Sequence, residues 1–272
     1  MVPEILVINL DRSQDRLEFI ASQMQRLGLV FTRLRATDAT MIGDDEFDRL
    51  GGTYMRPLSR TELACLHSHS RAWRHCVDNN RPVLVLEDDV VLSEKLPSWL
   101  AELDDIDLLD ILNLETRGAE KWVSRRPFSS APKSGIRHYR LFVDRGGSGG
   151  YLVRPAAAHR LLQRAKHYAA PSDAFLNFAG IPRLQAEPGL ATPLYASAGA
   201  QDGFRGAFKT TISQPSKQSR LDAFVRRPQF KLRRLAGHFA MTARKLGTLP
   251  RGVKRPIAVC PTILDHAAKR SA

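Results

Sequence analysis

The sequence predicts an α/β domain of the Rossmann type with a mainly parallel central sheet, and three observations indicate it. An apolar run at 4–10, a helically spaced segment at 13–27 and an alternating segment at 30–34 form a β-α-β unit. The apolar run 83–86 leads directly into three carboxylates, as a buried strand does when it ends in a polar cleft. Apolar residues make up 43% of the 272 residues, so a sizeable core is available.

Start and stop signals place the other elements in chain order. A capping-box pattern, Ser-Arg-Thr-Glu from Ser59, opens a helix that we expect to end near Asn79, before the Arg-Pro pair. Further strands are predicted at 108–114 and 151–153, and further helices at 155–165 and 174–178. Gly146–Gly150 is predicted to be a mobile or phosphate-binding loop. Residues 38–54 are polar and Gly-rich, and we expect a loop with little regular structure.

The net charge of +13 is concentrated at the C-terminal end. Residues 205–272 hold sixteen Lys/Arg and two Asp/Glu, whereas the other 204 residues sum to −1 (25 Lys/Arg against 26 Asp/Glu). We therefore divide the chain into a domain at 1–215 and a basic C-terminal extension at 216–272, which is either helical or disordered. Apolar residues interleave with the basic ones at 226–255. This pattern suits an anionic membrane surface, a helix packed on the domain with a solvated basic face, or disorder.

The sequence also predicts the compartment. The three cysteines form no paired framework, which suits a reducing environment. The apolar run at 4–10 is too short for a signal peptide and lacks basic residues before it. No stretch approaches the roughly 20 apolar residues of a membrane-spanning helix. We expect a cytoplasmic protein. It could be bound peripherally to the inner face of the inner membrane.

Glu87-Asp88-Asp89 is the strongest candidate site. Adjacent carboxylates at the end of a buried strand repel one another and are costly to desolvate unless a cation lies beside them. A hard divalent ion, Mn²⁺ or Mg²⁺, bound in turn to diphosphate oxygens, would remove that repulsion. The alternative is a solvated turn after a strand.

Asn9, Arg12 and Arg16 follow the first strand and would reach the same sheet edge, where guanidinium groups suit a diphosphate. A surface helix start with local ion pairs is the other interpretation.

Five blocks in this order resemble glycosyltransferase family 25, the lipooligosaccharide galactosyltransferase-like group. They are Val7–Arg16, Glu62–His69 with its Cys-x-x-Ser-His ending, Val83–Val90, Gly146–Tyr151 and Pro171–Asp173. The resemblance extends over about residues 4–215, and the ordered combination is more specific than any single block.

This resemblance implies a GT-A-like fold and transfer of a sugar, typically galactose from UDP-galactose, with inversion. The acceptor would be a lipopolysaccharide, a lipooligosaccharide or another surface glycan. Asp89, with Glu87 or Asp88, would hold the metal and the donor. The donor-binding residues implied in this way, together with those expected from the sheet edge, are Asn9, Arg12, Arg16, Asp38, Ser68, His69, Glu87 and Asp88.

Inverting transfer requires a carboxylate that takes the acceptor hydroxyl proton. Asp173 is the candidate base, because it follows the Gly-rich turn where an acceptor could enter, and Glu115 at the end of its own strand is the rival. Asp173 could instead be an ordinary helix N-cap.

Two other functions stay open. One is a non-catalytic protein that binds nucleotide sugars. The other is a nucleic-acid-binding protein that uses the basic extension, although zinc-ligand spacing and aromatic stacking signatures are missing from the sequence. We expect no nucleic-acid partner.

Overall fold

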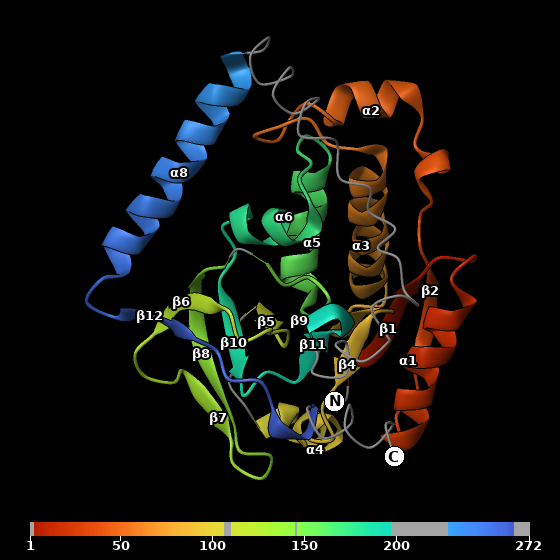
Figure 1. Ribbon diagram of the computed structural model, residues 1–272, viewed down its shortest axis with the longest axis vertical. Coiled ribbons are helices and arrows are strands. Elements are labelled where there is room, and N and C mark those ends of the chain that lie inside the picture. Colours follow the sequence, from red (N-terminus) through yellow and green to blue (C-terminus); the bar gives the residue numbers. More distant parts are fainter. Residues whose placement is uncertain (1–2, 106–109, 145, 197–227, 264–272) are drawn as a thin grey trace.

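The computed structural model describes residues 3–105, 110–144, 146–196 and 228–263 of the chain. These residues form one large sheet with helices on both sides, and α8 runs along one flank (Figure 1). One buried apolar cluster joins α3 and α5 to one face of the sheet, and a second joins α1 and α4 to the other face. The predicted α/β class is therefore confirmed.

The elements have the following bounds. The strands are β1 Glu4–Asn9, β2 Thr32–Arg35, β3 Val83–Glu87, β4 Val90–Leu92, β5 Ile111–Asn113, β6 Glu120–Ser124, β7 Ser129–Ala131, β8 Ile136–Val143, β9 Gly150–Val153, β10 Arg183–Glu187, β11 Ala191–Pro193 and β12 Gly252–Pro256. The helices are α1 Gln14–Arg26, α2 Asp44–Leu50, α3 Arg60–Asp78, α4 Leu96–Ala101, α5 Pro155–Ala165, α6 Ser172–Phe178 and α8 Pro228–Thr248, and the 3-10 turns are η1 Ala39–Met41, η2 Leu103–Asp105 and η3 Leu194–Ala196.

The sheet is mixed, with its parallel part where the sequence indicates a β-α-β unit. Its order is β12-β6-β8-β10-β5-β9-β3-β1-β2, and β1 pairs in parallel with both β2 and β3. β9 lies antiparallel between β3 and β5, so β3 and β5 run in the same direction. The carboxyl ends of β1, β3 and β5 therefore meet at one edge, where polar residues that follow them can converge.

Helix α3 forms as its sequence predicts, because its first turn is capped from both sides. The Ser59 hydroxyl accepts a hydrogen bond from the Glu62 N–H (3.2 Å), and the Glu62 carboxylate accepts one from the Ser59 N–H (2.9 Å). Leu63, Leu66 and Trp73 are buried on one face at helical spacing. This fixed helix presents its polar residues to the sheet edge described above.

The prediction of a loop throughout residues 38–54 is wrong for two segments. Asp38 caps η1 by accepting a hydrogen bond from the Thr40 N–H (3.0 Å). Helix α2 opens with Asp44-Asp45-Glu46, which face the positive end of its dipole, and it ends on the buried Leu50. The polar composition of this segment gave no sign of a helix. One buried residue and favourable charges at the N-terminus are enough to stabilise two helical turns on the surface of a folded domain.

The basic extension is helical over 228–248, which is one of the two alternatives that the sequence left open, and it also contributes a strand that the sequence did not predict. β12 pairs antiparallel with β6, with Val253 opposite Val123. After it, Cys260 and Ile263 are buried against Val91. The predicted boundary between 215 and 216 lies outside the described residues and stays a prediction. In the described part of the chain, no helix combines the length and apolar character that crossing a bilayer requires.

His138 on β8 is buried without charge beneath α4. Its Nε2 accepts a hydrogen bond from the Trp99 indole N–H (2.9 Å), and its Nδ1 lies 3.1 Å from the Ser129 hydroxyl. Burial lowers the pKa of His138 from 6.5 to about 4. Protonation of His138 at Nε2 would place its new N–H opposite the Trp99 indole N–H, so two hydrogen-bond donors would face each other. Between pH 6.5 and 4 the unfolded chain therefore binds a proton that the folded chain excludes, and stability rises with pH in that window.

We expect acidification from pH 6.5 to 4 to remove up to about 3 kcal/mol of stability through His138, at about 1.4 kcal/mol per pH unit. His138→Gln has no titrating group in this window, so the difference in unfolding free energy between wild type and variant should narrow by that amount. Urea unfolding at several pH values measures it. A difference that is the same at pH 7 and pH 4 would contradict the assignment.

Candidate active site

A pocket of about 830 Å³ opens at the sheet edge where β1, β3 and β5 end. Its walls come from the β1–α1 turn, from one face of α3, from the Gly-rich loop before β9, from the start of α6 and from the segment after β5. Segments far apart in the sequence thus meet around one cavity. Of the sequence-predicted site residues, those that line it are Arg12, Arg16, Ser68, His69, Glu87, Asp88, Asp89, Glu115 and Asp173.

Asp88 is the internal anchor of the acidic triplet. Its Oδ2 accepts a hydrogen bond from the Asn9 amide (2.8 Å), and its Oδ1 accepts one from the Arg16 guanidinium (3.1 Å). Asn9 itself is 1% exposed and lies below the pocket rather than in its lining. Burial raises the pKa of Asp88, while Asn9 and Arg16 oppose the shift. Both oxygens are occupied, so Asp88 holds the turn after β3 in place.

Asp89 faces the pocket and shares Arg16 with Asp88, at 3.4 Å. Burial and the nearby charge of Glu87 raise the pKa of Asp89 to about 7, although Arg16 counteracts them. A carboxyl group in this state gains strongly from any cation that enters the pocket. Asp89 is therefore the member of the triplet that is best suited to a cationic ligand.

Glu87 is held by the floor of the pocket. The Ser148 hydroxyl donates a hydrogen bond to its Oε1 (2.9 Å), and the Nε2 of the fully buried His69 lies 3.3 Å from the same oxygen. Burial disfavours a charge on Glu87, but His69, Ser148 and Arg16 outweigh it and lower its pKa. Burial likewise opposes a charge on His69, yet Tyr151, Cys65 and Glu87 raise its pKa. Glu87, with 29% of its side chain exposed, thus pairs with the fully buried His69 at the floor of the pocket.

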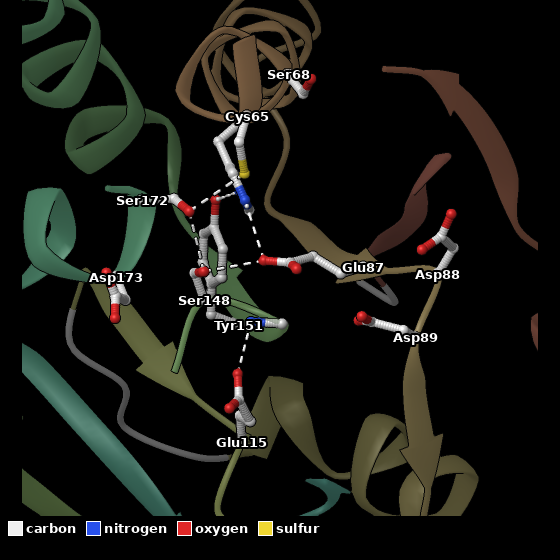
Figure 2. A network of polar contacts seen from close by, with 12 residues as sticks. Cys65, Ser68, Glu87, Asp88, Asp89, Glu115, Ser148, Tyr151, Ser172 and Asp173 are labelled. Atoms are coloured by element: carbon white, nitrogen blue, oxygen red, sulfur yellow. Dashed lines mark hydrogen bonds and ion pairs between the residues drawn. The ribbon is translucent and has the colours of Figure 1, made fainter. Parts of the chain in front are cut away.

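A chain of hydroxyl groups connects Glu87 to the start of α6. The Ser148 Oγ lies 3.1 Å from the Ser172 Oγ, which lies 3.4 Å from the Cys65 Sγ on α3 (Figure 2). Asp173 follows Ser172 directly, and its Oδ1 accepts a hydrogen bond from the next N–H (2.6 Å). Burial raises the pKa of Asp173. In Figure 2, Asp88 and Asp89 lie on one side of Glu87 and Asp173 lies on the other.

Glu115 follows β5 and lines the same pocket, and it is 7% exposed. Its Oε2 accepts a hydrogen bond from the Gly149 N–H (2.6 Å). Burial and the charge of Glu87 raise the pKa of Glu115 to about 7. Beneath it, the buried Lys121 donates to the Glu115 carbonyl (3.0 Å) and pairs with Asp144 (2.8 Å). The buried Lys121 thus lies between two buried residues of the pocket lining, Glu115 and Asp144.

The predicted nucleotide side has its own fixed contacts. Arg12, with 56% of its side chain exposed, pairs with Asp38, and the Thr40 N–H and Arg12 lower the pKa of Asp38 to about 2. The Ser68 hydroxyl accepts a hydrogen bond from the Thr37 N–H (2.9 Å) and so joins α3 to the segment after β2. Asp38 is outside the pocket lining, so it reaches the pocket only through Arg12.

The residues fit a divalent cation only if a ligand completes its coordination. Among the described residues, no group of three or more His, Cys, Asp or Glu side chains is arranged to hold a metal. Ser148 and His69 contact the Oε1 oxygen of Glu87, and Asp89 faces the pocket with a raised pKa. This donor set suits an ion that takes one or two protein carboxylates and fills its other positions with water and phosphate oxygens.

Residues 2–176 of the chain match the sequence model of glycosyltransferase family 25, described as an LPS biosynthesis protein family. This span is more than half of the chain. The chain belongs to glycosyltransferase family 25. Every block on which the resemblance rested falls within the matched span, and so do all the residues predicted for the site.

Three relatives show the range of this family. A glycosyltransferase 25 family member from Aedes aegypti is 31% identical over 60% of this chain and 28% of its own length. The lipooligosaccharide biosynthesis protein lex-1 of Haemophilus influenzae is 31% identical over 43% of this chain and 40% of its own length. Procollagen galactosyltransferase 1-B of Xenopus laevis is 26% identical over 58% and 28%. The chain spans less than half the length of each of these relatives.

Several residues of this family 25 site escaped the sequence reasoning. No functional role was predicted for Lys121, Asp144, Ser148, Ser172 or Cys65, although all five line the pocket. Lys121 left one signal, because it lies in phase with Val123 on the buried face of an alternating strand. The two serines left none, since a serine in a Gly-rich loop or before a helix is common.

Gly149 tests whether the Gly-rich loop is fitted to Glu115. A Cβ at Gly149 would lie 2.9 Å from both Glu115 Oε2 and Val90 Cγ1, whereas one at Gly146 would meet its nearest atom at 3.8 Å. We expect Gly149→Ala to lower the unfolding free energy by about 1–3 kcal/mol. Gly146→Ala, in the same loop, should stay close to wild type. Equal stability of the two variants in denaturant unfolding would show that the close approach is not constraining.

Proposed function

We propose that this chain is a glycosyltransferase that uses a nucleotide-sugar donor and transfers the sugar to a glycan acceptor. One observation carries the proposal: a single pocket is lined both by carboxyl groups of raised pKa, Asp89 and Glu115, and by the guanidinium groups of Arg12 and Arg16. A nucleoside diphosphate needs cations for its phosphates, and an attacking hydroxyl needs a carboxylate for its proton. Membership of family 25 supports the same reaction class.

Mn²⁺ or Mg²⁺ would be held by Asp89 with Glu87, and it would supply positive charge to a bound diphosphate. Within the chain, Arg16 fixes the two aspartates from one side, and His69 balances the charge of Glu87 from below. Arg12 at the mouth is placed for a phosphate oxygen or for the nucleoside, and Asp38 limits its positions. These residues bind and orient the donor, and their buried partners keep the site from rearranging.

Inversion follows if the acceptor hydroxyl attacks C1 of the sugar from the face opposite the diphosphate. Asp173 would accept the hydroxyl proton, because it lies across Glu87 from Asp89 (Figure 2) and its pKa is raised by burial. Glu115 is the rival base. It is more buried, and the Gly149 N–H occupies one of its oxygens, so it is better placed to support the loop than to meet an acceptor.

The sugar is proposed to be galactose, delivered as UDP-galactose. A relative named as a procollagen galactosyltransferase supports this choice. The acceptor is proposed to be a lipopolysaccharide or lipooligosaccharide, or another surface glycan, and the relative named for lipooligosaccharide biosynthesis supports it.

The donor site is tested by release of UDP from a panel of UDP-sugars with and without Mn²⁺. We expect metal-dependent release from UDP-galactose, and a loss of at least about 100-fold in Asp89→Asn, because the carboxylate that faces the ion is gone. Asp45→Asn, an exposed change on α2, should keep the wild-type rate. If no UDP-sugar is bound in calorimetry or turned over, the proposed donor site is wrong.

The base is tested by transfer to a lipooligosaccharide acceptor in two variants. Asp173→Asn should slow transfer about 10²- to 10⁴-fold while donor affinity stays unchanged, because only the proton acceptor is removed. Glu115→Gln is the matched comparison and should retain more activity. Near-normal turnover in Asp173→Asn would refute its role, and a selective loss in Glu115→Gln would give that role to Glu115.

A further inference from the structure

Among the residues that the structure describes, helix α8 packs on the rest of the molecule through one face. The residues of this packed face recur at helical spacing and are Phe230, Gly237, Arg244 and Thr248. A side chain at Gly237 would overlap the methyl group of Met55. The Arg244 guanidinium donates a hydrogen bond to the carbonyl of Asn177 at the end of α6 (2.9 Å). These contacts fix the rotation of α8 about its axis and so determine which residues point away from the protein.

The opposite face of α8 is apolar and exposed. We call it the apolar stripe, and its members are Leu232 (69% exposed), Leu235 (68%), Phe239 (75%) and Leu246 (61%). At 3.6 residues per turn, these positions fall within an arc of roughly 60° that is centred opposite Phe230. Leu249, just after the helix, is also 48% exposed. Single exposed leucines are ordinary, but an aligned set on one helix marks a contact surface.

Basic residues border the apolar stripe. Lys231, His238 and Lys245 lie seven residues apart and form a line along one edge of the stripe. Residues 228–256 contain eight Lys/Arg and not one Asp/Glu. An apolar face with a basic margin is the pattern of helices that lie in the interface of an anionic bilayer, where apolar side chains enter the acyl boundary and cations meet the headgroups.

We propose that the apolar stripe of α8 binds the surface of an anionic lipid bilayer. Charge decides against a second copy of this chain as the occupant, because pairing two α8 helices would bring together two segments that carry only positive charges. Residues 197–227 of the same chain hold six Lys/Arg and two Asp/Glu, so their net charge has the same sign. An anionic surface complements both the stripe and its margin.

This contact would orient the pocket. Helix α8 is joined to Met55 and to α6, and α6 begins with the Ser172–Asp173 pair that lines the pocket. The side of the molecule that carries Asp173 is therefore the side tied to α8. For the lipid-linked acceptor of the proposed function, on which this consequence rests, the lipid surface would concentrate the acceptor on the Asp173 side.

The binding itself is tested with the full chain and sedimented vesicles, and it needs no donor or acceptor. One set of vesicles is pure phosphatidylcholine, and the other contains about one third phosphatidylglycerol. We expect binding to the anionic set, and about a tenfold or larger decrease in Phe239→Glu and in Leu235→Glu. Lys231→Gln with Lys245→Gln should weaken binding about tenfold or more at low salt and flatten its salt dependence.

Val30→Glu is the matched control. Val30 is 89% exposed and lies between α1 and β2, on the opposite side of the molecule from α8 (Figure 1). It should bind vesicles as the wild type does. Thermal unfolding should be unchanged in Phe239→Glu, because that side chain is exposed. UDP release should also be unchanged in that variant, which separates failure of this proposal from failure of the proposed function.

Two results would overturn the proposal. In the first, wild type and Phe239→Glu bind the anionic vesicles equally, or neither binds. In the second, light scattering shows a dimer without lipid that Phe239→Glu dissociates, which would assign the apolar stripe to a second copy. Retained vesicle binding with no turnover of any UDP-sugar would support the lipid contact and refute only the proposed function.

Discussion

Electrostatic repulsion among three consecutive carboxylates at the end of β3 is the constraint around which this site is built. Each carboxylate is stabilised in a different way. Asp88 is held internally by Asn9 and Arg16, and Glu87 is paired from below with His69. Asp89 is left facing the cavity with a pKa near 7. Arg16 lies on α1 and His69 on α3. These two helices must therefore pack at fixed positions on the sheet for the carboxylates to be stable at the end of β3. The charge balance of the site therefore depends on how the helices pack on the sheet.

Sequence reasoning succeeded where a local signal and a structural requirement coincide. The capping box at Ser59, the apolar run into Glu87 and the β-α-β unit each have a short pattern with one physical meaning, and the structure contains all three. Helix α2 and strand β12 were missed because their stability comes from tertiary contacts. Leu50 is the only buried residue of α2, and Gly252 is the only buried residue of β12, which lies at the edge of the sheet. The antiparallel half of the sheet also has no signature in single segments, since register depends on partners distant in the sequence.

The candidate site was predictable to the same degree. Residues at the carboxyl ends of parallel strands must share an edge, and this rule placed Asn9, Glu87 and Glu115 together. It could not show that Asn9 serves Asp88 from beneath the pocket, or that Lys121 supports Glu115. Such buried polar contacts join residues more than 70 positions apart, or residues on strands whose order was unknown. These hydrogen bonds and ion pairs are of common types, and which residues form them is determined by the fold.

The return of the chain into the sheet after α8 has a consequence for the order in which the molecule is made. Strand β12 covers the exposed edge of β6, and Cys260 and Ile263 close the apolar cluster around Val91. During translation all of these groups emerge after α8, so the edge of β6 and the surface of Val91 stay open to water while the pocket-forming segments are already available. An unpaired strand edge invites intermolecular pairing. The nascent chain is thus most exposed to association just before residues 252–263 leave the ribosome, and premature termination there would produce a species with a nearly complete site and an open sheet.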